Sequence, residues 1–153
     1  MKHFITILAV ILMISSGLMM DAQETVKPTK GLTVTIMIFS GRTNPTFTIK
    51  DETIISHISG TLSKMPNTEK CNGLTISPSV LGYQGILVEN TSDMMTETES
   101  FIVRHSKVEL NNKNATQYIL DDFATELENY LIQLAEEQGI IDQTLVNVIK
   151  TQK

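Results

Sequence analysis

Cysteine is almost absent from this sequence. Cys71 is the single cysteine among 153 residues, which excludes an internal disulfide framework. In an oxidising compartment a lone thiol is buried, free, or paired with a second chain. The stretch from Glu69 to Gly73 around it is polar, which favours an exposed thiol. A dimer linked through Cys71 is therefore one assembly that the sequence allows.

Runs of basic residues are also missing. The chain has 12 lysines and arginines against 17 aspartates and glutamates, and its formal net charge is -5. Nucleic acids and anionic membrane surfaces attract clusters of lysine and arginine, so the acidic balance argues against both partners. A protein or a small ligand remains as the expected partner.

Familiar catalytic signatures are absent as well. The sequence contains no G-x-S-x-G, H-E-x-x-H, P-loop or cysteine–histidine pattern. His57 and His105 are the histidines beyond the N-terminal segment, and two histidines without a third ligand do not define a metal site. We therefore predict no catalytic residue, no metal site and no cofactor.

The first 22 residues have the layout of a secretory signal peptide. Lys2 and His3 give a short positive start, and an apolar run follows from Phe4 to Ile14. The alternative is a membrane-spanning helix, which usually needs about 20 apolar residues, and this run is shorter. We expect a signal peptide at residues 1–22, a flexible lead-in at 23–31 and a single domain at 32–153. The protein is then secreted and extracellular, without membrane contact after cleavage.

Two strands are expected at the start of the domain. Residues from Leu32 to Phe39 alternate with a period of two in mainly β-branched side chains, which predicts a strand with an apolar face. Ser40–Pro45 interrupts the alternation, and Thr46–Ile49 resumes it. The sequence therefore predicts a strand, a tight structured loop and a second strand.

The loop at Ser40–Pro45 has a defined chemistry. Gly41 accepts a positive φ, and Pro45 fixes its own φ and extends Asn44. The Asn44 side chain can hydrogen-bond nearby backbone, and Arg42 lies near the tip of a stiff turn. In one interpretation Arg42 binds an anion or carboxylate through its planar fork of donors. In the other it bonds loop carbonyls or a neighbouring acid and locks the turn.

Helix and strand patterns alternate in the middle of the chain. Asp51 can cap a helix that ends before Pro66. A loop-rich passage with a short strand at Leu74–Ile76 leads to a predicted strand at Leu81–Glu89. A polar connection then precedes a fourth predicted strand at Phe101–Leu110, whose last residues follow a bulge or offset.

The clearest helical pattern lies near the C-terminus. Asn114 and Gln117 are separated by three positions, which is the spacing of a capping box. Apolar residues from Ile119 to Leu134 then recur at helical spacing. The acidic residues between them, including Glu128, are expected to face water. Gly139 ends this helix, and Asp142 caps a short last one.

Four further residues carry predictions about the surface. Tyr83 can present its hydroxyl to a ligand, although such a ring more often packs and satisfies its hydroxyl locally. Gly85, inside a strand pattern, indicates a bulge or a close backbone approach. Asn90 and Asn114 each begin an acceptor pattern for N-glycosylation, so we expect a glycoprotein if the source is a eukaryote.

Two of these segments resemble an uncharacterised family of small, often secreted proteins. Its members carry an S-G-R-P-N-P loop followed by an aromatic residue and, later, an L-G-Y-x-G strand entry. Here Ser40–Pro45 and Phe47 match the first motif, with threonine in place of the first proline, and Leu81–Gly85 matches the second. The resemblance supplies no catalytic residue. It implies that the motifs meet in space, with the arginine loop packed against Tyr83 and Gly85.

The sequence as a whole predicts an α+β fold. We expect a four-stranded, mainly antiparallel sheet packed by two helices, followed by a short C-terminal helix. The expected function is that of a secreted binding or interaction module, with Arg42, Asn44 and Tyr83 as candidate ligand-binding residues. The alternatives are a small secreted hydrolase that uses Arg42 and a carboxylate, and a self-associating extracellular structural protein.

Overall fold

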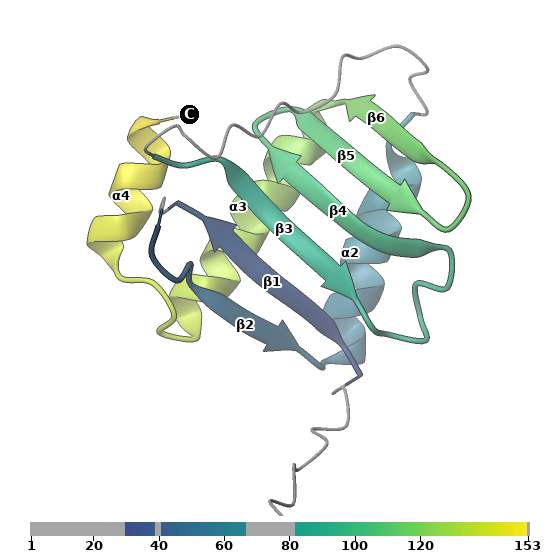
Figure 1. The fold of residues 1–153 in the computed structure, drawn as a ribbon, viewed down its shortest axis with the longest axis horizontal. Helices are drawn as coiled ribbons and strands as arrows, with labels where there is room; N and C mark the ends of the chain where they lie inside the picture. The colour runs from purple at the N-terminus through teal and green to yellow at the C-terminus, as the bar shows by residue number, and fades with distance from the viewer. Residues whose placement is uncertain (1–29, 39–40, 67–81, 153) are drawn as a thin grey trace, which may run out of the picture.

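The computed structural model describes residues 30–38, 41–66 and 82–152. These residues form six strands and three helices in two layers (Figure 1). The strands are β1 (Leu32–Met37), β2 (Thr46–Ile49), β3 (Gly85–Asn90), β4 (Thr98–Arg104), β5 (Lys107–Asn112) and β6 (Thr116–Leu120). The helices are α2 (Glu52–Lys64), α3 (Asp122–Glu137) and α4 (Gln143–Thr151).

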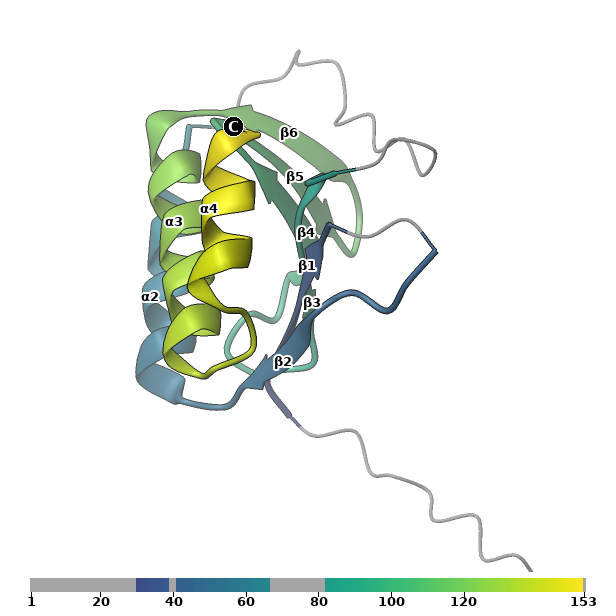
Figure 2. The ribbon, with the colours of Figure 1, turned by 90° about the vertical axis from the view of Figure 1, so that its left-hand side faces the viewer.

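The strands form one antiparallel sheet in the order β2-β1-β3-β4-β5-β6. Because β2 and β3 are both antiparallel to β1, they run parallel to each other, and the connection between them, which contains α2, crosses over β1. All of the described helices lie on one face of the sheet (Figure 2). The opposite face carries no described helix, and the α+β class predicted from the sequence is confirmed.

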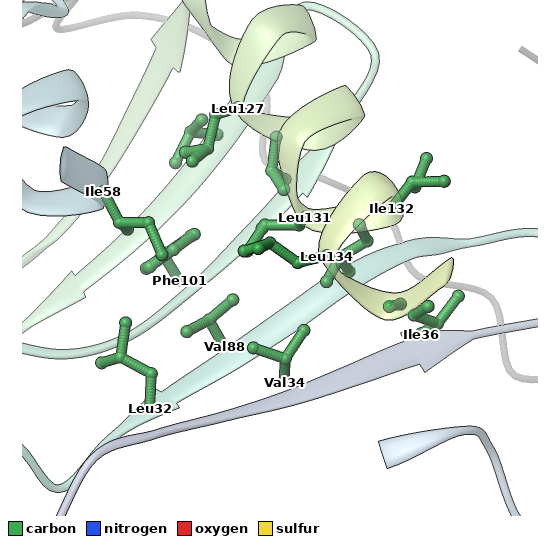
Figure 3. Packing of buried hydrophobic residues seen from close by; sticks show 14 of the residues in the cluster. Leu32, Val34, Ile36, Ile58, Val88, Phe101, Leu127, Leu131, Ile132 and Leu134 are labelled. Carbon is green, nitrogen blue, oxygen red and sulfur yellow. The ribbon is translucent and has the colours of Figure 1, made fainter. Parts of the chain in front are cut away.

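The core lies between the helices and the inner face of the sheet. In β1, Leu32, Val34 and Ile36 are fully buried, which confirms the period-two pattern of the sequence. A row of inner residues crosses five strands: Phe47, Val34, Val88, Phe101 and Leu110. Helix α3 packs Leu127 and Leu131 into the same cluster (Figure 3). Burying one such side chain contributes about 1.5–3 kcal/mol relative to leaving it exposed.

Three aspartates begin the three described helices. Asp51 accepts hydrogen bonds from the backbone N–H groups of Thr53 at 2.8 Å and Ile54 at 3.2 Å. The bond from Ile54 has the largest effect on the pKa of the Asp51 carboxyl, and both bonds lower it. Asp121 and Asp142 each accept a bond from a backbone N–H group in the first turn of their own helix. The caps predicted at Asp51 and Asp142 are therefore confirmed.

Gly139 ends α3, as the sequence predicts. Its φ of 68° lies in the left-handed region, where glycine carries no side-chain penalty. Its N–H donates to the Glu136 carbonyl at 2.9 Å, and the N–H of Ile140 donates to the Ala135 carbonyl at 2.9 Å. These bonds satisfy carbonyls at the end of the helix and turn the chain toward α4.

The prediction of four strands is wrong, and one reason lies in Phe101–Leu110. This segment is a hairpin rather than a single strand, with His105 and Ser106 between β4 and β5. His105 takes a φ of 55°, a conformation that tight hairpin turns require. Val103 pairs with Val108 across the hairpin. The apolar side chains of both strands therefore face the core, and the turn leaves little trace in the sequence pattern.

The second reason lies in Thr116–Leu120. This segment was expected to open the long helix, but it is the edge strand β6. Ala115 and Asn112 exchange backbone hydrogen bonds that close the β5–β6 turn, so the capping box predicted at Asn114–Gln117 does not form. The helix begins only after Asp121. Pairing with β5 decides the outcome, because strand formation depends on neighbouring strands more than on local preference.

The predicted strand at Leu81–Glu89 corresponds to β3, which begins at Gly85. Cys71 and the short strand predicted at Leu74–Ile76 lie outside the described residues. The N-terminal segment predicted as a signal peptide and lead-in also lies outside them, through residue 29.

Candidate functional site

The face of the sheet opposite the helices is the candidate binding surface, and we call it the outer face. Its middle row takes one residue from each strand: Thr46, Thr35, Leu87, Ile102, Glu109 and Tyr118. Leu87, Ile102 and Tyr118 are half-buried. They place two aliphatic side chains and one aromatic ring within a largely polar face.

Polar and charged side chains border this row. One neighbouring row runs through Thr48, Thr33, Glu89, Ser100, Asn111 and Thr116. Within it, the Thr116 hydroxyl donates to Asn111 Oδ1 at 2.8 Å. On the other side of the middle row, Arg104 pairs with Lys107 across β4 and β5. The outer face therefore has the composition of a protein contact surface, with apolar groups at the centre and polar groups around them.

The loop between β1 and β2 projects from the outer-face side of the molecule (Figure 2). Asn44 Oδ1 accepts a hydrogen bond from the Ile38 N–H at 3.0 Å, and the Pro45 carbonyl accepts one from the Ile36 N–H at 2.9 Å. Arg42 is exposed. No carboxylate of the described residues lies within ion-pair distance of it. Asn44 and Pro45 thus fix the end of a loop that presents Arg42 to solvent.

Replacing Asn44 with alanine is expected to lower the free energy of unfolding by about 1 kcal/mol, the usual net value of one hydrogen bond. The reason is that the Ile38 N–H loses its acceptor. Urea denaturation measures the change. Asn44→Asp keeps an oxygen at the same place and is the matched control. Equal losses in both variants would contradict the assigned bond.

The two motif segments are adjacent in the sheet. Met37, the last residue of β1 before the arginine loop, pairs with Gly85, and the Gln84 N–H donates to the Met37 carbonyl at 2.7 Å. Gly85 has a φ of 118°, and a Cβ added there would lie 2.8 Å from the Val103 carbonyl oxygen. Glycine is required at this position because β4 passes so close. The close approach predicted for Gly85 is confirmed.

Tyr83 is directed into the protein rather than toward solvent. It is 3% exposed, and its hydroxyl donates to Glu128 Oε1 at 2.5 Å. Burial, followed by the neighbouring Glu128 carboxylate, raises the pKa of Tyr83 far above its usual value. The Tyr83 N–H also donates to Gln152 Oε1 at 2.5 Å. Tyr83 therefore ties the entry of β3 to α3 and to the end of α4.

Glu128 contradicts the prediction that the acidic residues of the long helix face water. It is 0% exposed and lies on the buried face of α3. Ala124 and Ile132, one turn before and one turn after it, are also buried. This spacing of four residues is the signal that would have placed Glu128 on the inner face. The bond from the Tyr83 hydroxyl to Oε1 offsets part of the cost of burying this carboxyl group.

The two histidines lie in separate places. His57 on α2 contacts Tyr130 on α3 edge to face, with the ring centroids 4.8 Å apart. His105 lies in the β4–β5 turn. Within residues 30–38, 41–66 and 82–152, no three histidine, cysteine, aspartate or glutamate side chains gather in a way that would hold a metal ion.

Three clefts lie away from the middle row of the outer face. One of about 300 Å³ opens between the end of α2 and the inner side of β4–β6, with Leu62, Met95 and Gln117 in its wall. A second, of about 370 Å³, is lined mainly by the β3–β4 loop and Lys113. A smaller one of about 120 Å³ lies between α2 and α3. These clefts do not include Arg42, Asn44 or Tyr83.

The two glycosylation candidates differ in environment. The Asn90 amide nitrogen donates to the carbonyls of Met95 and Thr98, each at 2.6 Å, and its Oδ1 accepts from the Ser92 N–H at 2.8 Å. Asn114 is exposed in the β5–β6 turn. Glycosylation stays a prediction at both, and Asn114 has the more accessible side chain.

Comparisons with protein-family models, curated proteins and solved structures found no match to this chain. The resemblance to the uncharacterised family therefore depends on the two short motifs. Among the described residues, no helix has both the length and the apolarity needed to cross a membrane.

Proposed function

We propose that the protein is a secreted binding module that recognises another protein through its outer face. The observation that carries this proposal is the middle row of the sheet, where Leu87, Ile102 and Tyr118 lie on a face that no described helix covers. Antiparallel sheets can leave one face in water, and that face is then usually polar. Apolar residues at its centre suit a surface that a partner covers.

A macromolecular partner suits this face better than a small molecule does. Small ligands bind in concave pockets that bury most of their surface, and the three clefts described above are built by other parts of the chain. The outer face instead offers residues from all six strands in one layer. Such a surface matches the extended contact that two proteins make.

Charged residues around the centre would orient the partner. Arg42 is exposed on the β1–β2 loop, and Glu89 and Lys107 are exposed on the sheet. Rim charges mainly govern association rate and partner choice, whereas central apolar and aromatic residues contribute most of the affinity. We therefore expect Ile102 to matter more for affinity than Arg42, and Arg42 to make association sensitive to salt.

A photo-crosslinking residue placed at Leu87 tests the proposal in the protein secreted by its native host. We expect one specific protein adduct from Leu87 and none from Gln133, an exposed position on α3 in the helix layer. The adduct is identified by mass spectrometry. Binding of the purified partner to Ile102→Glu is then expected to weaken at least about tenfold, because a charge enters the apolar centre.

The control is Gln133→Glu, which adds the same charge on the helix side and should leave binding unchanged. Adducts of equal yield at both crosslinker positions would count against the outer face. Undiminished binding of Ile102→Glu would do the same. Arg42→Ala tests the contribution of the β1–β2 loop separately from that of the sheet. This variant should slow association without abolishing the complex.

A further inference from the structure

Among the described residues, no strand pairs with the outer edge of β6. Strand β6 is last in the sheet order and pairs with β5 alone among the described strands. Its residues, Thr116–Leu120, include no charge, proline or glycine. The opposite edge strand, β2, has four residues and follows Pro45. Charged residues, proline and short length are the usual protections of an edge strand, and β6 has only its modest length.

The backbone groups that face outward can be assigned from the hairpin. Ala115 and Asn112 exchange hydrogen bonds, and the Asp121 N–H donates to the Ser106 carbonyl. In an antiparallel pair, alternate residues bond to the partner strand. Ala115 and Asp121 both bond toward β5, so in the strand between them the alternate residues Gln117 and Ile119 also bond to β5. Thr116, Tyr118 and Leu120 direct their N–H and C=O groups away from the sheet.

We propose that β6 pairs with β6 of a second copy of the chain, antiparallel and about a two-fold axis at Tyr118. Tyr118 then lies opposite Tyr118 of the second copy, and Thr116 lies opposite Leu120. Each of these three residues exchanges both backbone hydrogen bonds with its counterpart. The same arrangement places the two Tyr118 rings side by side on the outer face, and it covers Leu120, which is 49% exposed.

Charge complementarity supports a second copy as the occupant of this edge. Exposed Lys113 lies just before β6, and exposed Asp122 lies just after it. Antiparallel pairing brings Lys113 of each copy near Asp122 of the other. Within one chain the two residues are kept apart by the length of the strand, roughly 17 Å for five residues at about 3.3 Å each. The ends of β6 are therefore matched to each other only between copies.

This dimer is independent of Cys71 and extends the proposed binding surface. The two six-stranded sheets become continuous, and their outer faces form one surface with two-fold symmetry. A failure of self-pairing would leave the proposed function of a single copy intact, because the Leu87 crosslink does not require a dimer.

Sedimentation velocity in excess reductant tests the proposal with two charge variants. Lys113→Glu places like charges at both contacts of its own dimer, and Asp122→Lys does the same with the opposite sign. We expect the unmodified protein to dimerise with rising concentration and each variant alone to dimerise at least about tenfold more weakly. An equimolar mixture of the two should recover the dimer, because both contacts then join opposite charges.

A second pair of variants addresses the strand itself. Tyr118→Lys puts two like charges beside the two-fold axis, while Glu109, its neighbour on β5, supports the new lysine within the chain. Thr48→Lys places the same charge on the outer face of the other edge strand and is the control. We expect a monomer from the first and an unchanged dimer from the second, with circular dichroism confirming that both are folded. A monomeric unmodified protein, or a dimer insensitive to Tyr118→Lys, overturns the proposal.

Discussion

Replacing Phe101 with alanine is expected to lower the free energy of unfolding by about 3–5 kcal/mol, the range for deleting a buried aromatic side chain. Phe101 is 0% exposed. It lies between Val88 and Leu110 in the inner row of the sheet, on the side covered by the helices (Figure 3). The loss combines the transfer of the ring to water with the cavity that remains. Urea denaturation of both proteins measures it.

The neighbouring residue provides the control for Phe101. Ile102 follows it in β4 and lies on the outer face, where it is half-buried. Its replacement by alanine leaves no closed cavity, so we expect a loss below about 1.5 kcal/mol. The same variant should weaken partner binding, whereas Phe101→Ala should act on stability. Equal losses of stability at the two positions would contradict the assignment of a covered and an uncovered face.

Replacing Tyr83 with phenylalanine is expected to cost about 1–3 kcal/mol of stability, because the hydroxyl that donates to Glu128 Oε1 is removed from a buried site. Glu128→Gln is the matched variant, since it keeps the shape of the acceptor and removes its charge. A double-mutant cycle of Tyr83→Phe and Glu128→Gln isolates the coupling between the two side chains. Strictly additive losses would show that the negative charge of Glu128 adds nothing to the hydrogen bond from Tyr83.

The raised pKa of Tyr83 leads us to expect a loss of stability at alkaline pH. The folded-state pKa of Tyr83 is raised by burial and by Glu128, whereas in the unfolded chain it returns to about 10. The folded protein therefore binds one more proton than the unfolded chain above pH 10, and stability falls as the pH rises. We expect the unmodified protein to lose about 1.4 kcal/mol more per pH unit there than Tyr83→Phe does. Parallel pH profiles for the two proteins would contradict this linkage.

Local sequence features predicted a substantial part of the fold. The alternation of Leu32, Val34 and Ile36 identified β1 and its buried face, because side chains of a strand point alternately to its two sides. Asp51 and Gly139 marked helix ends, since each satisfies backbone groups within a few residues of itself. The β1–β2 loop with Asn44 was predicted for the same reason.

The candidate surface was only partly predictable. The sequence indicated that Arg42 lies on a defined loop, and it is exposed there. The central residues Leu87, Ile102 and Tyr118 were not recognised, because no local pattern tells which face of a sheet the helices will cover. The sequence suggested Tyr83 as a ligand contact, but its hydroxyl donates a hydrogen bond to Glu128. Glu128 is 45 positions away in the chain, so no local pattern indicates this bond.

The amino-acid sequence by itself determined the α+β class, the helix caps at Asp51 and Asp142 and the inner face of the first strand, features with strong local signals. Only the tertiary structure decided that Thr116–Leu120 is an edge strand and that Glu128 is buried. Both depend on distant partners, since β5 supplies the ladder for β6 and Tyr83 supplies the bond to Glu128. Such pairings arise when the whole sheet assembles, and a local pattern compatible with a helix yields to them.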